Sequence, residues 1–510
     1  MTQLAFYIVS DVHGYLFPTD YQDKTQRLPM GLLHTKAIIE EDSAQYKNTI
    51  RIDNGDFLQG SPIGHYLAKE RESAEQLAAI YNQFVFDLGV IGNHEFNFGL
   101  NYLKDTLADL DYPVLSANIL ENGEPFTGHG VTYLQREGLT IGVIGLTTQY
   151  IPHWEKAEYI EGLTFESAES TLAQWLPEVR AKSDIVAVCY HGGFERDLES
   201  GAPTEALTGE NEGYALLDRF HTDIDLLITG HQHREIAQVI HGVPVIQPGS
   251  KGNTVGKIVL DYHDQGVHHA TAQLLTDDNP DKAVLTDELQ QFSDYIEQWL
   301  DAPITLLSED MVVEDQFKAR TAPHPYLNFL NYILMEASNA PIAASALFDL
   351  SRGFKGEVTM RDVLNNYPFP NTFNVLKLSG QDIKDALEQT AEYFEVQDQE
   401  VIVNPEYVEP KPQHYNYDIW SGIAYTIKAG NPKGERITRL THQGQPIAMH
   451  QTYEVVLNNY RAVGGGNYPM FSEDKIIKSI PTEGAQLIID YLQAHPELDI
   501  PNVTDFKVEV

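Results

Sequence analysis

The segment at residues 4–14, LAFYIVSDVHG, decides the fold: a nearly continuous apolar run ends in Asp11 and His13. An apolar run of this kind predicts a β-strand that is covered on both faces. Similar runs recur through the first 275 residues, and each is followed by a polar or glycine-containing loop and then a helical pattern. This alternation predicts an α/β domain whose sheet is buried between layers. The further runs are residues 48–53, 86–92, 139–146, 184–190, 224–230 and 243–249.

The pattern changes near Thr276. An apolar stripe with spacings of four and three residues predicts one amphipathic helix, which ends before Pro303. We interpret it as a connecting helix; the alternative is a peripheral helix of the first domain. Beyond it, strands such as residues 374–379 and 453–459 mix with helices. The predicted organisation is a first domain over residues 1–275, a linker over 276–320 and a mixed α/β second domain over 321–510. The stripe consists of Leu285, Leu289, Phe292, Ile296 and Trp299.

The charge of the chain excludes some classes of partner. Its 34 Lys and Arg against 74 Asp and Glu give a formal net charge of −40 over 510 residues. Such a surface repels polyanions at long range, so we expect no polymeric nucleic acid and no anionic membrane as partner. A small phosphate compound remains an acceptable substrate if a positive field is supplied locally. Bound metal is the obvious source of that field.

The sequence also bears on location and on the single cysteine. The amino terminus has no Lys or Arg before Lys24 and no cleavage-type site, so we expect no secretory signal there. No apolar run approaches the roughly 18 residues of a membrane span. We therefore expect a soluble cytoplasmic protein. Cys189 lies in the apolar run IVAVC, which predicts a packing role, and a lone cysteine excludes an intramolecular disulfide.

Polar side chains with metal-binding chemistry follow five of the predicted strands. In an α/β sheet the carboxyl ends of the strands are where ligands gather, so these side chains are expected to meet. Carboxylate, amide and imidazole groups suit Mn²⁺, Zn²⁺, Fe or Co²⁺, and affinity order does not choose between them. The set predicts a site for two divalent ions. Its members are Asp11 and His13 after the first run, Asp56 in RIDNGD, Asn93 and His94 in GNHEF, His191 in CYHGG, and His231 and His233 in GHQH.

The order Asp-x-His, Gly-Asp, Gly-Asn-His-Glu, His-Gly-Gly, Gly-His-x-His resembles the calcineurin-like metallophosphoesterase superfamily. The resemblance implies a layered β-sheet sandwich with helices outside. It implies that His94 faces the phosphate and is not a ligand. For the metals, it implies one ion held by Asp11, His13 and His233, a second ion held by Asn93, His191 and His231, and Asp56 bridging the two.

The charges of such a site agree with a phosphate substrate. Two divalent ions carry a charge of +4, and Asp11 and Asp56 together carry only −2, so the net charge of the pocket is positive although the protein is acidic. A pair of ions can activate a water and stabilise the charge of an in-line displacement. His94 can then protonate the leaving oxygen or stabilise its charge.

The second half of the chain extends the resemblance. Residues 367–380, 414–427 and 457–471 resemble the carboxy-terminal domain of bacterial 5′-nucleotidases and, more closely, that of 2′,3′-cyclic-nucleotide 2′-phosphodiesterase/3′-nucleotidases. The resemblance implies a nucleotide-binding domain in which Tyr415 and Tyr460 sandwich the base. Asn371 and Gly465 are further substrate-binding candidates. The alternatives are partly buried structural tyrosines and an ordinary glycine-rich turn.

One position separates the two branches. The 5′-nucleotidase branch carries Asp after NHEF, where it pairs with the histidine, whereas this chain carries Asn97, as does the cyclic-phosphodiesterase branch. The resemblance therefore implies His94 and Asn97 as the catalytic pair and favours hydrolysis of 2′,3′-cyclic and 3′ nucleotides. A broad 5′-nucleotidase or UDP-sugar pyrophosphatase is the alternative enzyme, and a catalytically silent nucleotide-binding sensor is the alternative of another class. The oligomeric state stays open.

Overall fold

The computed structural model describes residues 2–205, 207–264, 266–349, 351–409, 412–480, 482–495 and 497–510. Two compact units divide the chain, Met1–Ile296 and Glu297–Val510. The division falls inside helix α7 (Asp287–Leu300), which confirms the helix predicted from the apolar stripe. The domain bounds at residues 275 and 320 stay predictions.

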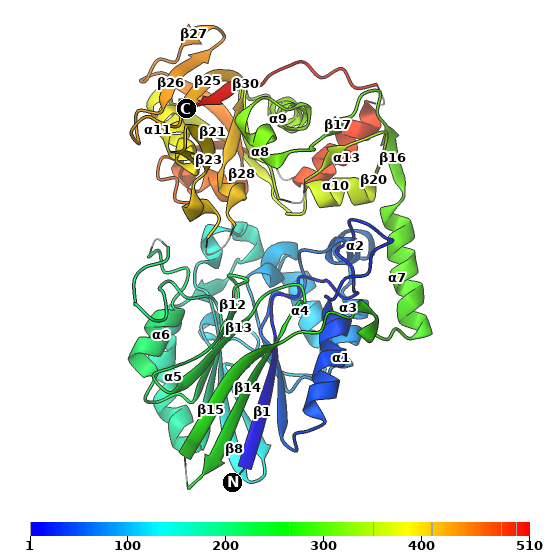
Figure 1. The fold of residues 1–510 in the computed structure, drawn as a ribbon, viewed down its shortest axis with the longest axis vertical. Helices are drawn as coiled ribbons and strands as arrows, with labels where there is room; N and C mark the ends of the chain where they lie inside the picture. Colours follow the sequence, from blue (N-terminus) through cyan, green and yellow to red (C-terminus); the bar gives the residue numbers. More distant parts are fainter. Residues whose placement is uncertain are drawn as a thin grey trace. The chain divides into compact units, whose positions relative to one another are not determined.

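Two six-stranded sheets form the first unit (Figure 1). In the order β15-β14-β1-β2-β3-β4, strands β1 to β4 are parallel, and β14 is antiparallel to β1. In the order β12-β13-β11-β10-β8-β7, the four central strands are parallel. All seven apolar runs are strands of these sheets, as predicted. The bounds are β1 Thr2–Val9, β2 Thr49–Asp53, β3 Leu88–Val90, β4 Val114–Leu115, β7 Val131–Arg136, β8 Leu139–Thr147, β10 Ile185–His191, β11 Leu226–Ile228, β12 Glu235–Ile240, β13 Val243–Pro248, β14 Val255–His263 and β15 Gly266–Leu275.

Strand β10 shows why its run is continuously apolar. Ala187 and Cys189 belong to a core cluster that also contains Phe6 and Ile8 of β1, so this face packs between the sheets. Val186 and Val188 belong to a second cluster with residues of the outer helices. Both faces of the strand are therefore buried. Cys189 has no exposed surface and burial raises the pKa of its thiol, which confirms its packing role.

Helices and short elements complete the first unit. Leu172 and Leu216 from two of these helices pack in the second core cluster, on the outer face of the second sheet. The helices are α1 Leu32–Ser43, α2 Pro62–Tyr66, α3 Glu75–Asn82, α4 Leu100–Asp109, α5 Ala168–Lys182 and α6 Gly213–Phe220, with the π-turn η1 Leu67–Arg71. The short strands are β5 Ile119–Glu121, β6 Glu124–Pro125 and β9 Leu163–Phe165, and the 3₁₀ turns are η2 His94–Phe98, η3 Ile151–His153, η4 Ala157–Tyr159 and η5 Pro280–Lys282.

The second unit is a mixed α/β fold, as predicted. Its main sheet has the order β24-β18-β28-β21-β29 (Asp418–Ser421, Ile342–Ala346, Thr452–Asn458, Phe373–Ser379, Ile476–Ile480). A second sheet has the order β27-β26-β25-β30 (Gln445–Pro446, Ile437–His442, Ile423–Lys428, Asp505–Glu509). The smaller pairs are β16 Pro303–Leu306 with β20 Glu357–Thr359, β17 Met311–Val312 with β19 Gly353–Phe354, and β22 Phe394–Gln397 with β23 Glu400–Val403.

The helices of this unit are α8 Gln316–Thr321, α9 Pro325–Ser338, α10 Met360–Asn366, α11 Gly380–Thr390, α12 Asn459–Ala462 and α13 Gly484–Ala494. Its 3₁₀ turns are η6 Ala391–Tyr393, η7 Pro405–Tyr407, η8 His414–Asn416 and η9 Glu473–Lys475. Among the helices of the described residues, none has both the length and the hydropathy required to cross a bilayer.

Candidate metal centre

The loops after β1, β2, β3 and β11, together with His191 at the end of β10, bring the predicted ligand residues together. Three overlapping groups hold ligand atoms within 4.8 Å of one another: Asp11, His13 and His233; His13, Asp56 and His94; and Asp56, His191 and His231. The remaining predicted ligand joins them, because Asn93 Oδ1 lies 2.8 Å from His231 Nδ1. The predicted ligand residues therefore lie close together in the structure, at the carboxyl ends of parallel strands. Which atoms hold a metal remains a prediction.

Five of the seven predicted ligands have left-handed backbone. The φ angles are 55° at Asp11, 54° at His13, 57° at Asp56, 68° at His231 and 58° at His233. Non-glycine residues rarely adopt this conformation, and it concentrates at functional sites. The Asp-x-His spacing predicts that both side chains project to the same side of a strand end. This prediction is wrong, because β1 ends at Val9 and both residues lie in the loop after it.

Backbone carbonyls orient two of the imidazoles. His13 Nδ1 lies 2.7 Å from the carbonyl oxygen of Gln59, and His191 Nδ1 lies 2.5 Å from that of Asn54. A carbonyl only accepts, so each Nδ1 donates and Nε2 is the atom left to bind a ligand. Burial lowers the pKa of His13 to about 3, which keeps this imidazole in the neutral form that coordinates metals.

In His231 it is Nε2, not Nδ1, that faces a hydrogen-bond acceptor of the protein. Its Nε2 lies 3.0 Å from Glu210 Oε1, and a carboxylate there takes a donated N–H, which leaves a lone pair on Nδ1. That lone pair faces the carbonyl oxygen of the Asn93 side chain at 2.8 Å. Two acceptors at this distance repel unless a proton or a cation lies between them.

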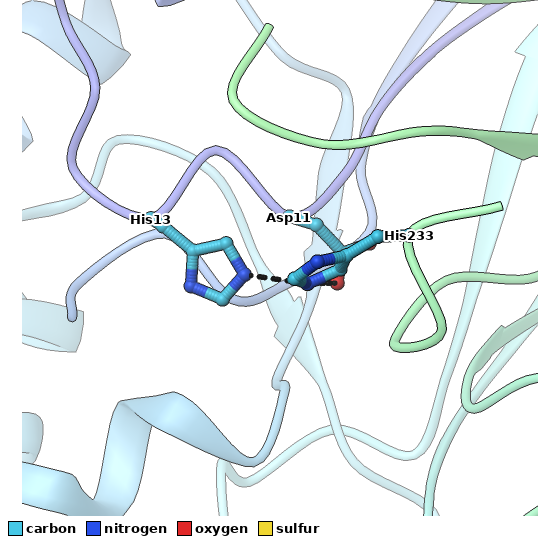
Figure 2. Close-up of side chains that lie close together, drawn as sticks. All are labelled: Asp11, His13 and His233. Carbon is cyan, nitrogen blue, oxygen red and sulfur yellow. Dashed lines mark hydrogen bonds and ion pairs between the residues drawn. The ribbon is translucent and has the colours of Figure 1, made fainter. Parts of the chain in front are cut away.

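Other atoms of the centre also fit cations. His13 Nε2 and His233 Nε2 face each other at 2.9 Å, and His233 Nε2 is 3.5 Å from Asp11 Oδ1 (Figure 2). Among the described residues, Asp56 Oδ2 and His191 Nε2 are buried without a hydrogen-bond partner, although they lie only 3.1 Å apart. Converging imidazole nitrogens and carboxylate oxygens of this kind are the ligand atoms that divalent transition metals bind.

The acidic and basic groups of the centre shift each other's ionisation. Burial raises the pKa of Asp56, but the neighbouring His191 and His94 charges outweigh it and hold that pKa well below its usual range. Burial lowers the pKa of His191, whereas the Asp56 and Asp11 charges raise it to about 10. Without a cation, the ionised Asp56 carboxylate is therefore balanced by a protonated His191, and a bound cation would take the place of the Nε2 proton.

Glu95 supports this centre, and the sequence analysis gave it no role. Its carboxylate has no exposed surface and accepts hydrogen bonds from the backbone N–H groups of Asp56 (2.8 Å), Phe57 (2.7 Å), Leu58 (3.2 Å) and Gly92 (2.6 Å). Glu95 thereby ties the loop after β2 to the loop after β3. The feature of the sequence that could have identified Glu95 is its position in GNHEF, directly after His94.

The predicted catalytic pair is brought together. His94 Nδ1 lies 2.6 Å from Asn97 Oδ1, and the backbone N–H of His94 donates to Asp56 Oδ1 at 2.8 Å. The His94 ring is half-buried and lies edge-on to His13, with ring centroids 5.1 Å apart. Because His94 also falls within ligand distance of His13 and Asp56, its role toward the phosphate stays a prediction.

In the second unit, Arg461 joins the two segments that carry the predicted base-stacking rings. Tyr415 lies in η8 and Tyr460 in α12, and both are half-buried. The Arg461 guanidinium donates to the carbonyl oxygen of Tyr415 at 3.3 Å and lies 5.7 Å from the Tyr460 ring centroid. It also pairs with Asp418 at 2.6 Å, and both side chains are buried. Sequence reasoning missed Arg461, although it directly follows Tyr460.

The other two substrate-binding candidates have contacts within the fold. A Cβ added to Gly465 would lie 2.7 Å from the Tyr460 ring, so a glycine there lets the ring pack against the backbone. The carbonyl oxygen of Asn371 accepts from the Gly484 N–H at 2.9 Å, and its side chain hydrogen-bonds Tyr367. The roles of Asn371 and Gly465 toward a substrate stay predictions.

Comparisons with known proteins agree with this architecture. The family model for calcineurin-like phosphoesterases matches residues 4–235, and the model for the 5′-nucleotidase C-terminal domain matches residues 307–473. The chain is 53% identical to a candidate 5′-nucleotidase from Staphylococcus aureus solved with alpha-ketoglutarate bound. That match covers 100% of both chains with a TM-score of 0.96.

Two curated relatives differ in length. The 2′,3′-cyclic-nucleotide 2′-phosphodiesterase/3′-nucleotidase of Yersinia enterocolitica is 28% identical, over 95% of this chain and 84% of the relative. The trifunctional nucleotide phosphoesterase protein YfkN of Bacillus subtilis is 25% identical over 96% of this chain, which spans only 38% of that relative's length. The full-length match to the Staphylococcus protein, together with the two family models, shows that this chain belongs to the calcineurin-like phosphoesterases with a 5′-nucleotidase C-terminal domain and is a hydrolase of phosphoester bonds.

Proposed function

We propose that this enzyme hydrolyses nucleoside phosphates with two divalent ions, and that 2′,3′-cyclic and 3′ nucleotides are its preferred substrates. The observation that supports two ions is two close pairs of candidate ligand atoms, His13 Nε2 with His233 Nε2 at 2.9 Å and His231 Nδ1 with Asn93 Oδ1 at 2.8 Å. Each pair belongs to a different predicted ligand set. The preference for cyclic substrates rests on Asn97 beside His94 and on the name of the Yersinia relative.

In this proposal Asp11, His13 and His233 would hold one ion, Asn93, His191 and His231 would hold the other, and Asp56 would serve both. Bound divalent ions supply Lewis-acid polarisation of the phosphoryl group in sites of this kind. The metal is one of Mn²⁺, Zn²⁺, Fe or Co²⁺, because the nitrogen and oxygen ligands suit all four. The cytoplasmic location stays a prediction.

His94 acts on the leaving group in this proposal. Its Nδ1 is held by Asn97 Oδ1, so Nε2 is the atom that carries the transferable proton. When the phosphorus–oxygen bond to the ribose breaks, the ribose oxygen takes the Nε2 proton. The oxygen of water becomes bonded to phosphorus, and one proton of that water passes to the solvent. The histidine is left neutral, with its remaining proton on Nδ1.

Hydrolysis of 5′ nucleotides is the second candidate function. The candidate 5′-nucleotidase from Staphylococcus aureus favours it, because this chain matches that protein over its whole length. An assay panel separates the two candidates: purified protein with Mn²⁺, tested on 2′,3′-cyclic AMP, 3′-AMP, 5′-AMP, UDP-glucose and bis-p-nitrophenyl phosphate. We expect the highest kcat/KM on the first two. A higher kcat/KM on 5′-AMP or UDP-glucose would contradict the preference for cyclic and 3′ nucleotides. If the panel is repeated with Zn²⁺, Fe and Co²⁺ and no metal supports turnover, the result would favour a catalytically silent nucleotide-binding sensor.

The His94→Ala variant tests the assignment of roles. We expect it to keep two ions per chain and to lose turnover on nucleotides, because the side chain acts on the leaving group. The loss should be smaller on a p-nitrophenyl ester, whose good leaving group needs no proton. If the variant loses metal together with activity, His94 is a ligand and the proposed role is wrong.

A further inference from the structure

Asn97 has a second partner that lies far away in the sequence. Its side-chain Nδ2 donates a hydrogen bond to Glu155 Oε1, 58 residues further along the chain. Its Oδ1 faces His94 Nδ1 at 2.6 Å. The three side chains therefore form a continuous series from Glu155 through Asn97 to His94. The chain carries an amide where the 5′-nucleotidase branch carries a carboxylate, and the carboxylate of Glu155 lies directly behind that amide.

The chemistry of this series allows only one orientation of the amide. A glutamate carboxylate only accepts, so the Asn97 atom that faces Glu155 must be the NH₂ group. The opposite orientation would place the amide oxygen against the carboxylate, and two acceptors at hydrogen-bond distance repel. Asn97 Oδ1 must therefore face His94, and because this oxygen only accepts, His94 Nδ1 must carry a hydrogen. Glu155 thus sets the tautomer of His94 through Asn97.

The segment that carries Glu155 is anchored at the metal centre. Glu155 follows the turn η3, in which Ile151 has no exposed surface. The neighbouring Trp154 packs on His231, with ring centroids 5.4 Å apart and an interplanar angle of 27°. The backbone N–H of Glu155 donates to the carbonyl oxygen of Ile151 at 3.0 Å. Glu155 is therefore held in place by backbone contacts and by a packed neighbour.

We propose that Glu155 is a positioning residue for catalysis: it fixes the Asn97 amide so that His94 keeps a hydrogen on Nδ1 and presents Nε2 to the leaving oxygen. The proposal rests on the proposed role of His94. In each turnover His94 begins with hydrogens on both nitrogens and gives the Nε2 hydrogen to the leaving oxygen. The neutral form that remains is the one that Asn97 and Glu155 stabilise.

A set of variants tests this role by activity. Glu155→Ala should lower kcat on 3′-AMP by about 10- to 100-fold, the usual loss when an orienting partner of a site histidine is removed. Glu155→Gln should lose less than Glu155→Ala, because a Gln oxygen can accept from Asn97, although its NH₂ group also allows the reversed orientation of the amide. The matched control is Glu158→Ala, which removes an exposed glutamate from the same segment and should change nothing. KM should change little in all three variants.

Asn97→Asp supplies the sharpest comparison. This change restores the carboxylate of the 5′-nucleotidase branch, but it places two carboxylates against each other, so the single variant should lose kcat. In the double variant Asn97→Asp/Glu155→Gln, the Gln amide can donate to the new carboxylate. Activity should therefore recover at least tenfold over Asn97→Asp alone. A double variant no more active than the single variant would overturn the proposal.

The tautomer can be observed without turnover. Two-dimensional ¹H–¹⁵N spectra of Zn²⁺-loaded, histidine-labelled protein distinguish a protonated Nδ1 from a bare one, and the His94→Ala spectrum assigns the His94 signals. Wild type should show hydrogen on Nδ1, whereas Glu155→Ala should show a mixture of tautomers. If wild-type protein hydrolyses nucleotides but Glu155→Ala keeps both its kcat and its Nδ1 signal, the proposal for Glu155 is wrong. If wild type itself does not turn over, it is the proposed function that fails.

Discussion

Replacing Glu95 by Ala should destabilise the first unit more than any exposed substitution. The buried Glu95 carboxylate accepts from four backbone N–H groups, of which Asp56, Phe57 and Gly92 make bonds of 2.6 to 2.8 Å. Without it these donors lose their partner inside the protein. Asp56, the predicted bridging ligand, lies on the released loop, so metal binding should weaken as well.

The magnitude follows from the number of donors. A buried donor left without a partner costs about 1–3 kcal/mol, so three donors set an upper range of about 3–9 kcal/mol. Water can enter the space left by the side chain and satisfy part of this loss. We therefore expect the free energy of unfolding to fall by about 3–5 kcal/mol. Glu95→Gln should lose less, because one side-chain oxygen still accepts while its NH₂ group faces donors.

Urea unfolding of the metal-free protein, followed by fluorescence and by circular dichroism, measures this effect. The matched control is Glu124→Ala, which removes an exposed glutamate of the same unit. Metal content of the folded variants, measured after dialysis against Mn²⁺, reports the second consequence. A Glu95→Ala protein within about 1 kcal/mol of wild type and with unchanged metal content would refute the reasoning.

Three further perturbations address the second unit and the pH dependence. Tyr415→Ala and Tyr460→Ala should each lower kcat/KM on nucleotides by about 5- to 150-fold, because base stacking contributes about 1–3 kcal/mol. Hydrolysis of bis-p-nitrophenyl phosphate, which has no base, should stay nearly unchanged. Equal losses on both substrates in steady-state assays would argue against stacking. Arg461→Met leaves the Asp418 carboxylate buried and unpaired, so thermal and urea unfolding should show a loss of about 3–5 kcal/mol; an unchanged melting temperature would contradict this. Burial raises the pKa of Glu205 to about 7, above its value in an unfolded chain, so its contribution to stability is present at low pH and is lost as pH rises toward 8. Between pH 5.5 and 8 the unfolding free energy of wild type should fall relative to Glu205→Gln by about 1–2 kcal/mol, and a difference of opposite sign would show that the pKa is not raised.

The strands and the cluster of site residues were predictable because their signals are local. The run around Cys189 is apolar at every position since both faces of β10 are buried, and such a run is visible without a partner. The predicted ligands were found because each follows such a run. The carboxyl ends of parallel strands then bring these residues together at the same end of the sheets.

The supporting residues were not predictable, because their roles depend on contacts between distant parts of the chain. Glu155 and Glu95 look like ordinary acidic residues until the loops that they bond are known. Arg461 likewise gains its role from Asp418, 43 residues away. The left-handed backbone at Asp11 was hidden for another reason: Asp adopts a positive φ more often than most residues, but its presence in a sequence does not identify where it does so.

Metal stoichiometry tests the two-ion proposal most directly. Metal-free protein is titrated with Mn²⁺ while hydrolysis of bis-p-nitrophenyl phosphate is followed, and the ions that remain after gel filtration are counted by mass spectrometry. Activity should rise until two equivalents are bound, and Asp56→Asn should weaken both binding steps. Full activity with a single bound ion, or with none, would contradict a site in which Asp56 joins two metals.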